Sequence, residues 1–456
     1  MKINLKFWGI LLIIGLSSFC LRTFYVRDLL LKDSSMRMAI KKNPDSRQYI
    51  HLAQNLSYLR CYAQASIDSR HKAILRTPGY PLFYSIFEYF GIAPKGVLFT
   101  QAVLGACIPV IASLLTYMIV GNILASIITG LLCAFSASGI FMTGEIMVDL
   151  VFAFVFIGGF YLLYTGIFRY SFKRIVSSGA TFGIGALVKP TLIFWPFYSI
   201  AICYSLAKGI GINLHRKIIL IFVIVQLEIM GGWCLRNFLL EGVFTLSTTG
   251  AHALRLYLAV EVEEVSRNTS TSKTIVKSIR NNRKKVQKQI DMTLNTGTSF
   301  AELQRTQLKE TFEILLAHPY NTWLSLARNI FGNISGPLPW HFFKNSIPRQ
   351  SLMYRFLPAI IFFSTYMIKI MYLVIVLYFI ISPWFFKNRL DNHLIRRFYI
   401  MISFFLTFVY FALISSLSFW AGPRLVYPVE FALVILFVLS CYTAWETYCS
   451  QRFYRA

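Results

Sequence analysis

Charged residues are scarce in this chain of 456 residues, where they make up only 14% of the sequence. In a soluble globular protein about a quarter of the residues are charged. The chain is also 56% hydrophobic, and long apolar runs recur along it. These features exclude an ordinary soluble domain and predict an all-α polytopic membrane protein.

Acidic residues are the scarcest of the charged types, with 19 Asp and Glu against 45 Lys and Arg, so the formal net charge is +26. Nucleic acid is a poor partner for so apolar a chain, and we expect none. Anionic membrane lipids and phosphate-bearing substrates suit a basic membrane protein better.

Metal-site and disulfide patterns are missing as well. Eight cysteines are present, but most lie in or beside apolar runs, and no pair has metal-site spacing. The sequence also has no internal repeat and no low-complexity tract. We therefore interpret the cysteines as small hydrophobic residues.

Apolar segments long enough to cross a bilayer, which takes about 20 residues each, number about ten. We expect them near 5–24, 97–119, 122–142, 147–168, 174–189, 191–207, 218–235, 364–386, 398–418 and 426–446. The fifth and sixth are short and are divided by Lys189 and Pro190. The first resembles a signal peptide but has no evident cleavage site, so we interpret it as an uncleaved helix.

Basic short segments set the orientation of these helices. Segments 168–174, 207–217 and 387–397 and the C-terminal tail carry Lys and Arg, which is typical of cytoplasmic loops. The N-terminus is then cytoplasmic too, and the two long loops face outward. The predicted parts are a first transmembrane helix (1–24), a first extracytoplasmic loop with amphipathic helices (25–96), helices two to seven (97–235), a second extracytoplasmic loop (236–360), and helices eight to ten with a cytoplasmic tail (361–456).

The second outer loop is polar, but it has sparse apolar positions at helical spacing. Segments 272–294 and 300–319 show this pattern, which predicts helices of a small extramembrane unit.

Several ionisable residues fall at the outer face in this topology, where charged groups at membrane helix ends are candidates for function. They come from elements far apart in the sequence and are Asp45, Arg76, Glu145, Asp149, Lys189, Arg236 and Arg424.

Each of these residues also has a structural explanation. Asp45 is placed to cap a helix, because it follows Pro44 and precedes apolar residues at helical spacing. The cations could anchor helix ends at lipid head groups. Glu145 and Asp149 are spaced i, i+4, so we expect them to share one helix face, hydrated or paired with those cations.

Two charges fall deeper in the predicted spans. Glu228 lies inside the seventh span and Lys369 lies early in the eighth. An unpaired charge at that depth is costly, so we expect both to have buried partners in structural pairs.

Five segments, in order along the chain, resemble motifs of the GT-C class of membrane glycosyltransferases, which use polyprenyl-phosphate-linked sugars. They are PDSRQYIHLAQNL (44–56), RTPGYPLFYSIF (76–87), LVKPTLIFWP (187–196), GGWCLRNFLLEGVFTLSTTG (231–250) and GPRLVYPVEFALVIL (422–436). The class includes the bacterial enzyme that adds aminoarabinose to lipid A and the protein O-mannosyltransferases. The fourth segment is the most specific, with a Trp, an Arg-Asn pair at a span end and a Ser/Thr-rich stretch.

The resemblance implies roles for individual residues. It makes Asp45 the catalytic carboxylate of the first outer loop. Asp28 and Asp33 compete, but they lie too close to the first span and lack the helix pattern that follows Asp45. The residues implied to bind the donor phosphate or the substrate are Arg76, Tyr80, Glu145, Asp149, Lys189, Arg236 and Arg424.

This sequence departs from the class at two of those positions. Lys189 stands where an Arg is usual, which keeps the charge but loses the planar fork that binds phosphate. Leu425 and Val426 separate Arg424 from Tyr427, where the class commonly has an Arg-Tyr pair. The chain also lacks a close acidic pair near Glu145, so we expect no cofactor and do not favour a divalent metal.

The activity implied is transfer of a sugar from a polyprenyl-phosphate donor to a lipid, glycan or protein acceptor of the cell envelope, at the outer face of the inner membrane. Asp45 would take the proton from the acceptor hydroxyl. The cations would stabilise the phosphate leaving group. Direct displacement would invert the anomeric centre.

Three alternatives stay open. The chain could be a polymerase or ligase of lipid-linked glycans, but these generally lack a long helical loop with an essential carboxylate after the first span. It could be a transporter or flippase of lipid-linked sugars, which predicts charged residues lining several spans near mid-membrane. It could also be an inactive relative that only binds glycolipid.

Overall fold

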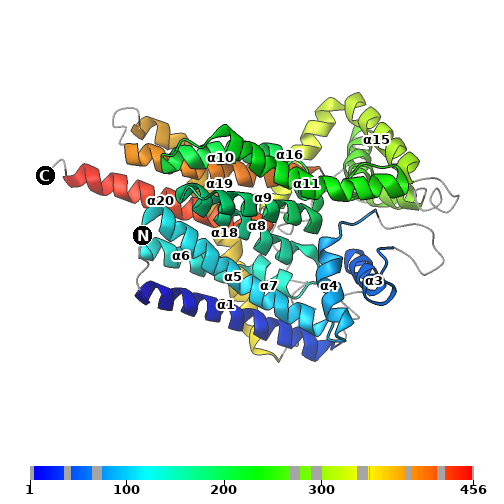
Figure 1. Cartoon of the computed structure of the whole chain (residues 1–456), viewed down its shortest axis with the longest axis horizontal. Helices are drawn as coiled ribbons and strands as arrows, with labels where there is room; N and C mark the ends of the chain where they lie inside the picture. The colour runs from blue at the N-terminus through cyan, green and yellow to red at the C-terminus, as the bar shows by residue number, and fades with distance from the viewer. Residues whose placement is uncertain are drawn as a thin grey trace.

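The computed structural model describes residues 5–34, 43–63, 74–267, 278–288, 300–335, 348, 350–386, 392–417 and 427–453. Helices dominate these ranges and form an elongated bundle (Figure 1). Both ends of the chain lie at one end of the bundle, while α3 (Pro44–Leu59), α4 (Gly79–Tyr89) and α15 (Phe300–Ala317) lie at the other. The helical fold class is therefore confirmed.

Seven helices of the described chain are long and apolar enough to cross a membrane, so the protein is membrane-embedded. They are α1 (Leu5–Lys32), α5 (Lys95–Val120), α8 (Val148–Phe168), α11 (Arg216–Glu241), α18 (Leu352–Phe386), α19 (Asn392–Ser416) and α20 (Glu430–Phe453), the last preceded by the short turn η4 (Tyr427–Val429).

An eighth candidate span is broken into two helices. α6 (Ile123–Ala134) and α7 (Ala137–Thr143) pass the test together but bend by 49° at the break. Ser136 begins the second piece, because its hydroxyl accepts a hydrogen bond from the backbone N–H of Gly139. The apolar run over 122–142 predicts one continuous helix, and the structure differs by this interruption.

The two short segments on either side of Pro190 are also helical. α9 (Phe172–Val188) has 17 residues and α10 (Trp195–Ile210) has 16, with the turn η1 (Pro190–Leu192) between them. They fall below the length required of a candidate span, so the ten-span topology stays a prediction. α1 and α11 run beyond their expected ends at 24 and 235, and α18 starts before 364.

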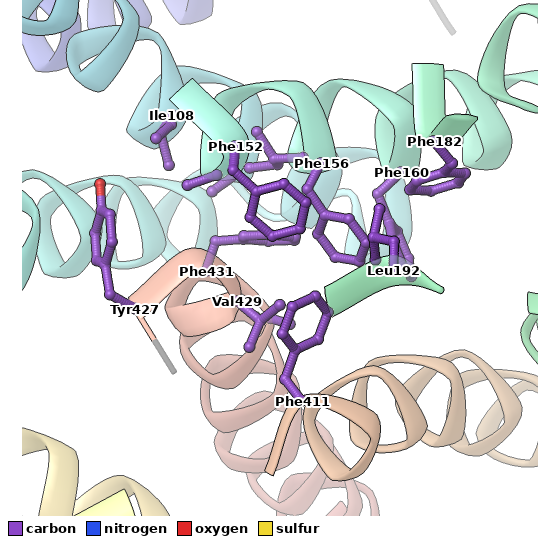
Figure 2. Packing of buried hydrophobic residues seen from close by; sticks show 14 of the residues in the cluster. Ile108, Phe152, Phe156, Phe160, Phe182, Leu192, Phe411, Tyr427, Val429 and Phe431 are labelled. Atoms are coloured by element: carbon purple, nitrogen blue, oxygen red, sulfur yellow. The ribbon is translucent and has the colours of Figure 1, made fainter. Parts of the chain in front are cut away.

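α8 lies at the centre of the bundle, and 72% of an apolar 18-residue stretch of this helix is buried. Its Phe156 ring meets the ring of Trp195 from α10 at 4.9 Å and that of Phe411 from α19 at 5.2 Å, both edge-on. Figure 2 shows the rings of Phe411 and Phe431 pointing toward those of Phe152 and Phe156. Helices far apart in sequence thus meet through one aromatic cluster.

The end of the bundle opposite the two chain termini carries a small unit from residues 249–335, with its own apolar cluster (Figure 1). Its helices are α12 (Thr249–Ala253), η2 (Leu254–Ala259), α13 (Val260–Arg267), residues 278–288, α15 and α16 (Pro319–Ser335). Arg283 and Arg328 each approach the buried Glu261 carboxylate to 3.7 Å. Burial raises the pKa of Glu261, and the two guanidinium groups oppose that rise.

Glu228 and Lys369, which were expected to be buried in the membrane spans, are both exposed. Glu228 is exposed on the surface of α11, and Lys369 is exposed on α18 with its ammonium 5.9 Å from the ring of Tyr366. The expectation of buried partners for these two residues was wrong, because each helix turns the charged position away from the bundle interior.

We predict that Gly179→Ala destabilises the bundle. A Cβ at Gly179 on α9 would lie 2.7 Å from the carbonyl oxygen of Phe222 on α11, so the two helices would have to separate. The expected loss is about 1–3 kcal/mol, measured as a lower thermal midpoint of the purified protein in detergent. Gly158→Ala on α8 is the matched control, because nothing lies within 4 Å of its added Cβ. Equal midpoints for the two variants would contradict this packing argument.

Candidate functional site

Asp45 lies in the first turn of α3, but it does not cap the helix. Asn43 is the N-cap, and its side-chain oxygen accepts a hydrogen bond from the backbone N–H of Asp45 at 3.1 Å. The expectation that Asp45 is the capping residue was therefore wrong. Capping by Asn43 leaves the Asp45 carboxylate available for contacts outside the helix.

The Asp45 carboxylate binds the guanidinium of Arg76, whose Nη2 donates to Oδ1 at 2.5 Å. Arg76 Nε also donates to Gln48 Oε1 at 2.8 Å, and the guanidinium lies over the ring of Tyr49, 5.1 Å from its centre. The Asp45 side chain is 28% exposed and that of Arg76 is 14% exposed. The pair is thus held by α3 and still reaches the protein surface.

Asp149 and Lys189 form a second ion pair, deeper in the bundle. Lys189 Nζ donates to Asp149 Oδ1 at 2.7 Å, and the two side chains are 8% and 1% exposed, respectively. Asp149 belongs to the first turn of α8, and Lys189 follows the last residue of α9. The pair joins these two helices in surroundings where either charge alone would be costly.

The two ion pairs are linked by a hydrogen bond between residues adjacent to them in the chain. Thr77, next to Arg76, donates its hydroxyl proton to the carbonyl oxygen of Val188, next to Lys189, at 3.1 Å. The surface pair and the buried pair therefore form two tiers of one site.

Tyr80 connects the first loop with the turn that precedes α8. Its hydroxyl donates to Gln101 Oε1 at 2.9 Å, and Gln101 Nε2 donates to the backbone carbonyls of Thr143 and Glu145, each at 2.9 Å. Its ring also meets that of Tyr49 edge-on at 5.2 Å. Burial raises the pKa of Tyr80, and the neighbouring carboxylates Asp149 and Glu145 add to the rise.

Glu145 and Asp149 do not share a helix face. Glu145 lies in the turn between α7 and α8, and only Asp149 is inside α8. The i, i+4 spacing predicted a common face and was misleading here, because the helix begins between the two residues.

Arg236, near the end of α11, joins the residues around Arg76. Its guanidinium lies 4.6 Å from the ring of Trp233 and 5.5 Å from that of Tyr62, and it donates to Asn237 Oδ1 at 2.8 Å. The Tyr62 hydroxyl in turn donates to the carbonyl oxygen of Arg76. Burial raises the pKa of Tyr62, while Arg236 and Arg76 oppose the rise.

The segment before α4 and the segment after α11 are tied together beside this cluster. The hydroxyls of Ser247 and Thr249 both donate to the carbonyl oxygen of Leu75, and the backbone N–H of Thr248 donates to the carbonyl of Ile74 at 3.1 Å. Segment 74–77 of the first loop is thus fixed by the second loop.

The structure therefore brings together Asp45, Arg76, Tyr80, Glu145, Asp149, Lys189 and Arg236 at one end of the bundle. Arg424 lies outside the described residues. Among the described residues, no group of three or more His, Cys, Asp or Glu side chains is arranged to hold a metal ion.

Sequence reasoning missed a third charged group, which joins α1, the α6–α7 break and α20. The Arg22 side chain is buried and donates from Nη1 to the hydroxyl of Ser18 and to the carbonyl of Ala134. Glu430 accepts a hydrogen bond from Ser136 at 2.9 Å. Arg22 was missed because it lies near the end of the first apolar run, close to the charged residues Arg27 and Asp28.

A cavity of about 20 Å³ lies between Arg22, Ser136, Tyr427 and Glu430. Arg22 is one of its lining residues, and its buried Nε has no hydrogen-bond partner among the described residues. The cavity has the size and polar lining that one ordered water requires.

Comparison with known proteins does not assign this chain to a family. No protein-family model matches it, and no curated protein matches it significantly.

We predict that Lys189→Met lowers stability more than loss of the whole ion pair does. The single variant leaves the Asp149 carboxylate buried without its cation, which costs about 3–5 kcal/mol. The variant with both Asp149→Asn and Lys189→Met has no buried charge at this site and is expected to recover part of the loss. The measurement is the thermal midpoint in detergent, and a double variant less stable than Lys189→Met would refute the account.

Proposed function

We propose that this protein is an integral-membrane glycosyltransferase with GT-C-like architecture, which moves a sugar from a polyprenyl-phosphate donor to an envelope acceptor. One observation carries the proposal. A partly exposed carboxylate, Asp45, lies 2.5 Å from a guanidinium, Arg76, at the end of a membrane-embedded bundle. A base beside a cation is what transfer from a phosphate leaving group requires.

In the proposed reaction, the acceptor hydroxyl hydrogen-bonds to the Asp45 carboxylate. The acceptor oxygen attacks the anomeric carbon as its proton passes to Asp45, and the bond from that carbon to the phosphate oxygen breaks. The lipid phosphate leaves with the bonding electrons. Because the acceptor attacks from the opposite side, the displacement inverts the anomeric centre. Arg76 and Arg236 stabilise the charge that develops on the phosphate.

Within this proposal, the buried Asp149–Lys189 pair acts differently from the surface residues. Its two side chains satisfy each other in the interior. We infer that it fixes α8 against α9 and so holds the floor of the site. Lys189 then supports Arg76 through the Thr77–Val188 contact and does not itself bind the donor phosphate.

The proposed topology has about ten spans, with the active site on the extracytoplasmic side. It counts the bent α6–α7 pair and the short helices α9 and α10 as spans. Two features support it. The two chain ends lie at the same end of the bundle, as an even number of crossings requires, and the cluster lies at the opposite end (Figure 1).

A transporter or flippase of lipid-linked sugars is the second candidate. It is favoured by two ionisable residues inside the bundle, the buried Arg22 and the half-buried Glu430, which both line one small cavity. Reconstituted vesicles separate the two functions: a transferase forms the glycosylated acceptor on one side, whereas a flippase moves unaltered donor across the bilayer.

We predict that Asp45→Asn abolishes sugar transfer. Loss of a general base lowers the rate by about 10²–10⁴-fold. Deletion of the gene, followed by mass spectrometry of envelope lipids, glycans and proteins, identifies the product, and each variant is then tested for restoring it. Asp33→Asn is the matched control, because it removes a carboxylate that lies near the end of α1 outside the cluster. Full activity of a normally inserted Asp45→Asn variant would rule out the assigned role.

We also predict that reporter fusions near residues 60 and 300 both report the outer side of the membrane. The reason is that both loops end at the same end of the bundle as the cluster. Periplasmic alkaline phosphatase activity is the measurement, and a fusion in the basic segment 207–217 is the cytoplasmic control. A cytoplasmic signal at either outer position would overturn the proposed location of the site.

A further inference from the structure

α16 has its polar face turned inward. Ser325, Asn329 and Asn333 recur every fourth residue and are buried. The side-chain amide of Asn329 donates to the carbonyl of Ser416 at 3.2 Å, and that of Asn333 donates to the carbonyl of Ser415 at 3.4 Å. α16 is therefore hydrogen-bonded to the last residues of α19, a candidate membrane span.

The opposite face of α16 is aromatic and uncovered. The exposed fractions of Tyr320, Trp323 and Phe331 are 77%, 74% and 72%, and Leu324 lies on the same face. Phe312 and Leu316, one turn apart near the end of α15, are exposed as well. We call these six residues the aromatic face.

This arrangement is the reverse of a helix that lies on a protein in water. Such a helix buries its large apolar side chains and exposes its amides. Here the amides are buried and the aromatic rings are exposed. The medium that contacts the aromatic face must therefore favour apolar side chains.

The position of α16 identifies that medium as the bilayer. Its polar face is bound to the end of α19, where a spanning helix leaves the hydrocarbon core. Leu413, in the last turns of α19, is exposed and belongs to the surface that the span presents to lipid. Trp and Tyr concentrate at this level of a membrane, where an amphipathic ring lies among the head groups.

We propose that α16 and the end of α15 form a membrane-binding surface that rests in the interfacial layer with its aromatic face in lipid. Part of the second outer loop is then held against the bilayer beside the bundle and does not stand free in water. This inference rests on the membrane-embedded bundle and on the α16–α19 contacts. It does not depend on sugar transfer or on which side of the membrane carries the loop.

The test uses the full-length protein in nanodiscs that contain one copy each. The emission of Trp323 is obtained by subtracting the spectrum of Trp323→Phe from that of the parent chain. We expect lipids brominated near the head-group end of the acyl chain to quench roughly half or more of this difference, as for an interfacial indole. Aqueous iodide should quench it weakly.

Trp445→Phe provides the matched control. Trp445 is 65% exposed on α20, a candidate span, so its emission should respond to brominated lipid. Strong iodide quenching of Trp323 without a response to brominated lipid would place the aromatic face in water and overturn the proposal. A lack of response to both quenchers would also overturn it, because protein would then cover the face.

Discussion

The structure depends on one constraint: a polar group buried among membrane helices must find its partner within the chain. The Asp149–Lys189 ion pair satisfies it between α8 and α9. The Gln101 amide satisfies it by binding two carbonyls in the turn before α8. A buried polar group has few alternative partners in lipid. These contacts therefore fix the start of α8 and the end of α9, and the Thr77–Val188 hydrogen bond connects them to the surface pair of Asp45 and Arg76.

Much of the helical framework could be predicted from the sequence, because runs of about 20 apolar residues have few other uses. The bend at Ser136 could not, since the contacts around it are made by Arg22 and Glu430, which lie 408 positions apart in the sequence. Glu228 shows the opposite failure. Its depth in an apolar segment predicted a buried partner, but helix rotation, which periodicity did not reveal, exposes it.

The residues of the candidate site were largely predictable as a group, whereas their contacts were not. Topology placed Arg76, Lys189 and Arg236 at one end of the bundle, and the structure places them there. It also shows that Lys189 is engaged by Asp149, and that Tyr62 and Tyr49 hold the two arginines through their rings. Pairings of this kind need tertiary structure, because either carboxylate could have met any of the cations.

The hydrogen bonds from Ser247 and Thr249 to the carbonyl of Leu75 have a consequence for how this protein can diverge. They join the segment that carries Arg76 to the segment that follows Arg236. A graft that replaces the segment after Arg236 with that of another protein would leave the Leu75 carbonyl without these donors. We therefore expect the two segments to change together in sequence, although 172 positions separate Leu75 from Ser247.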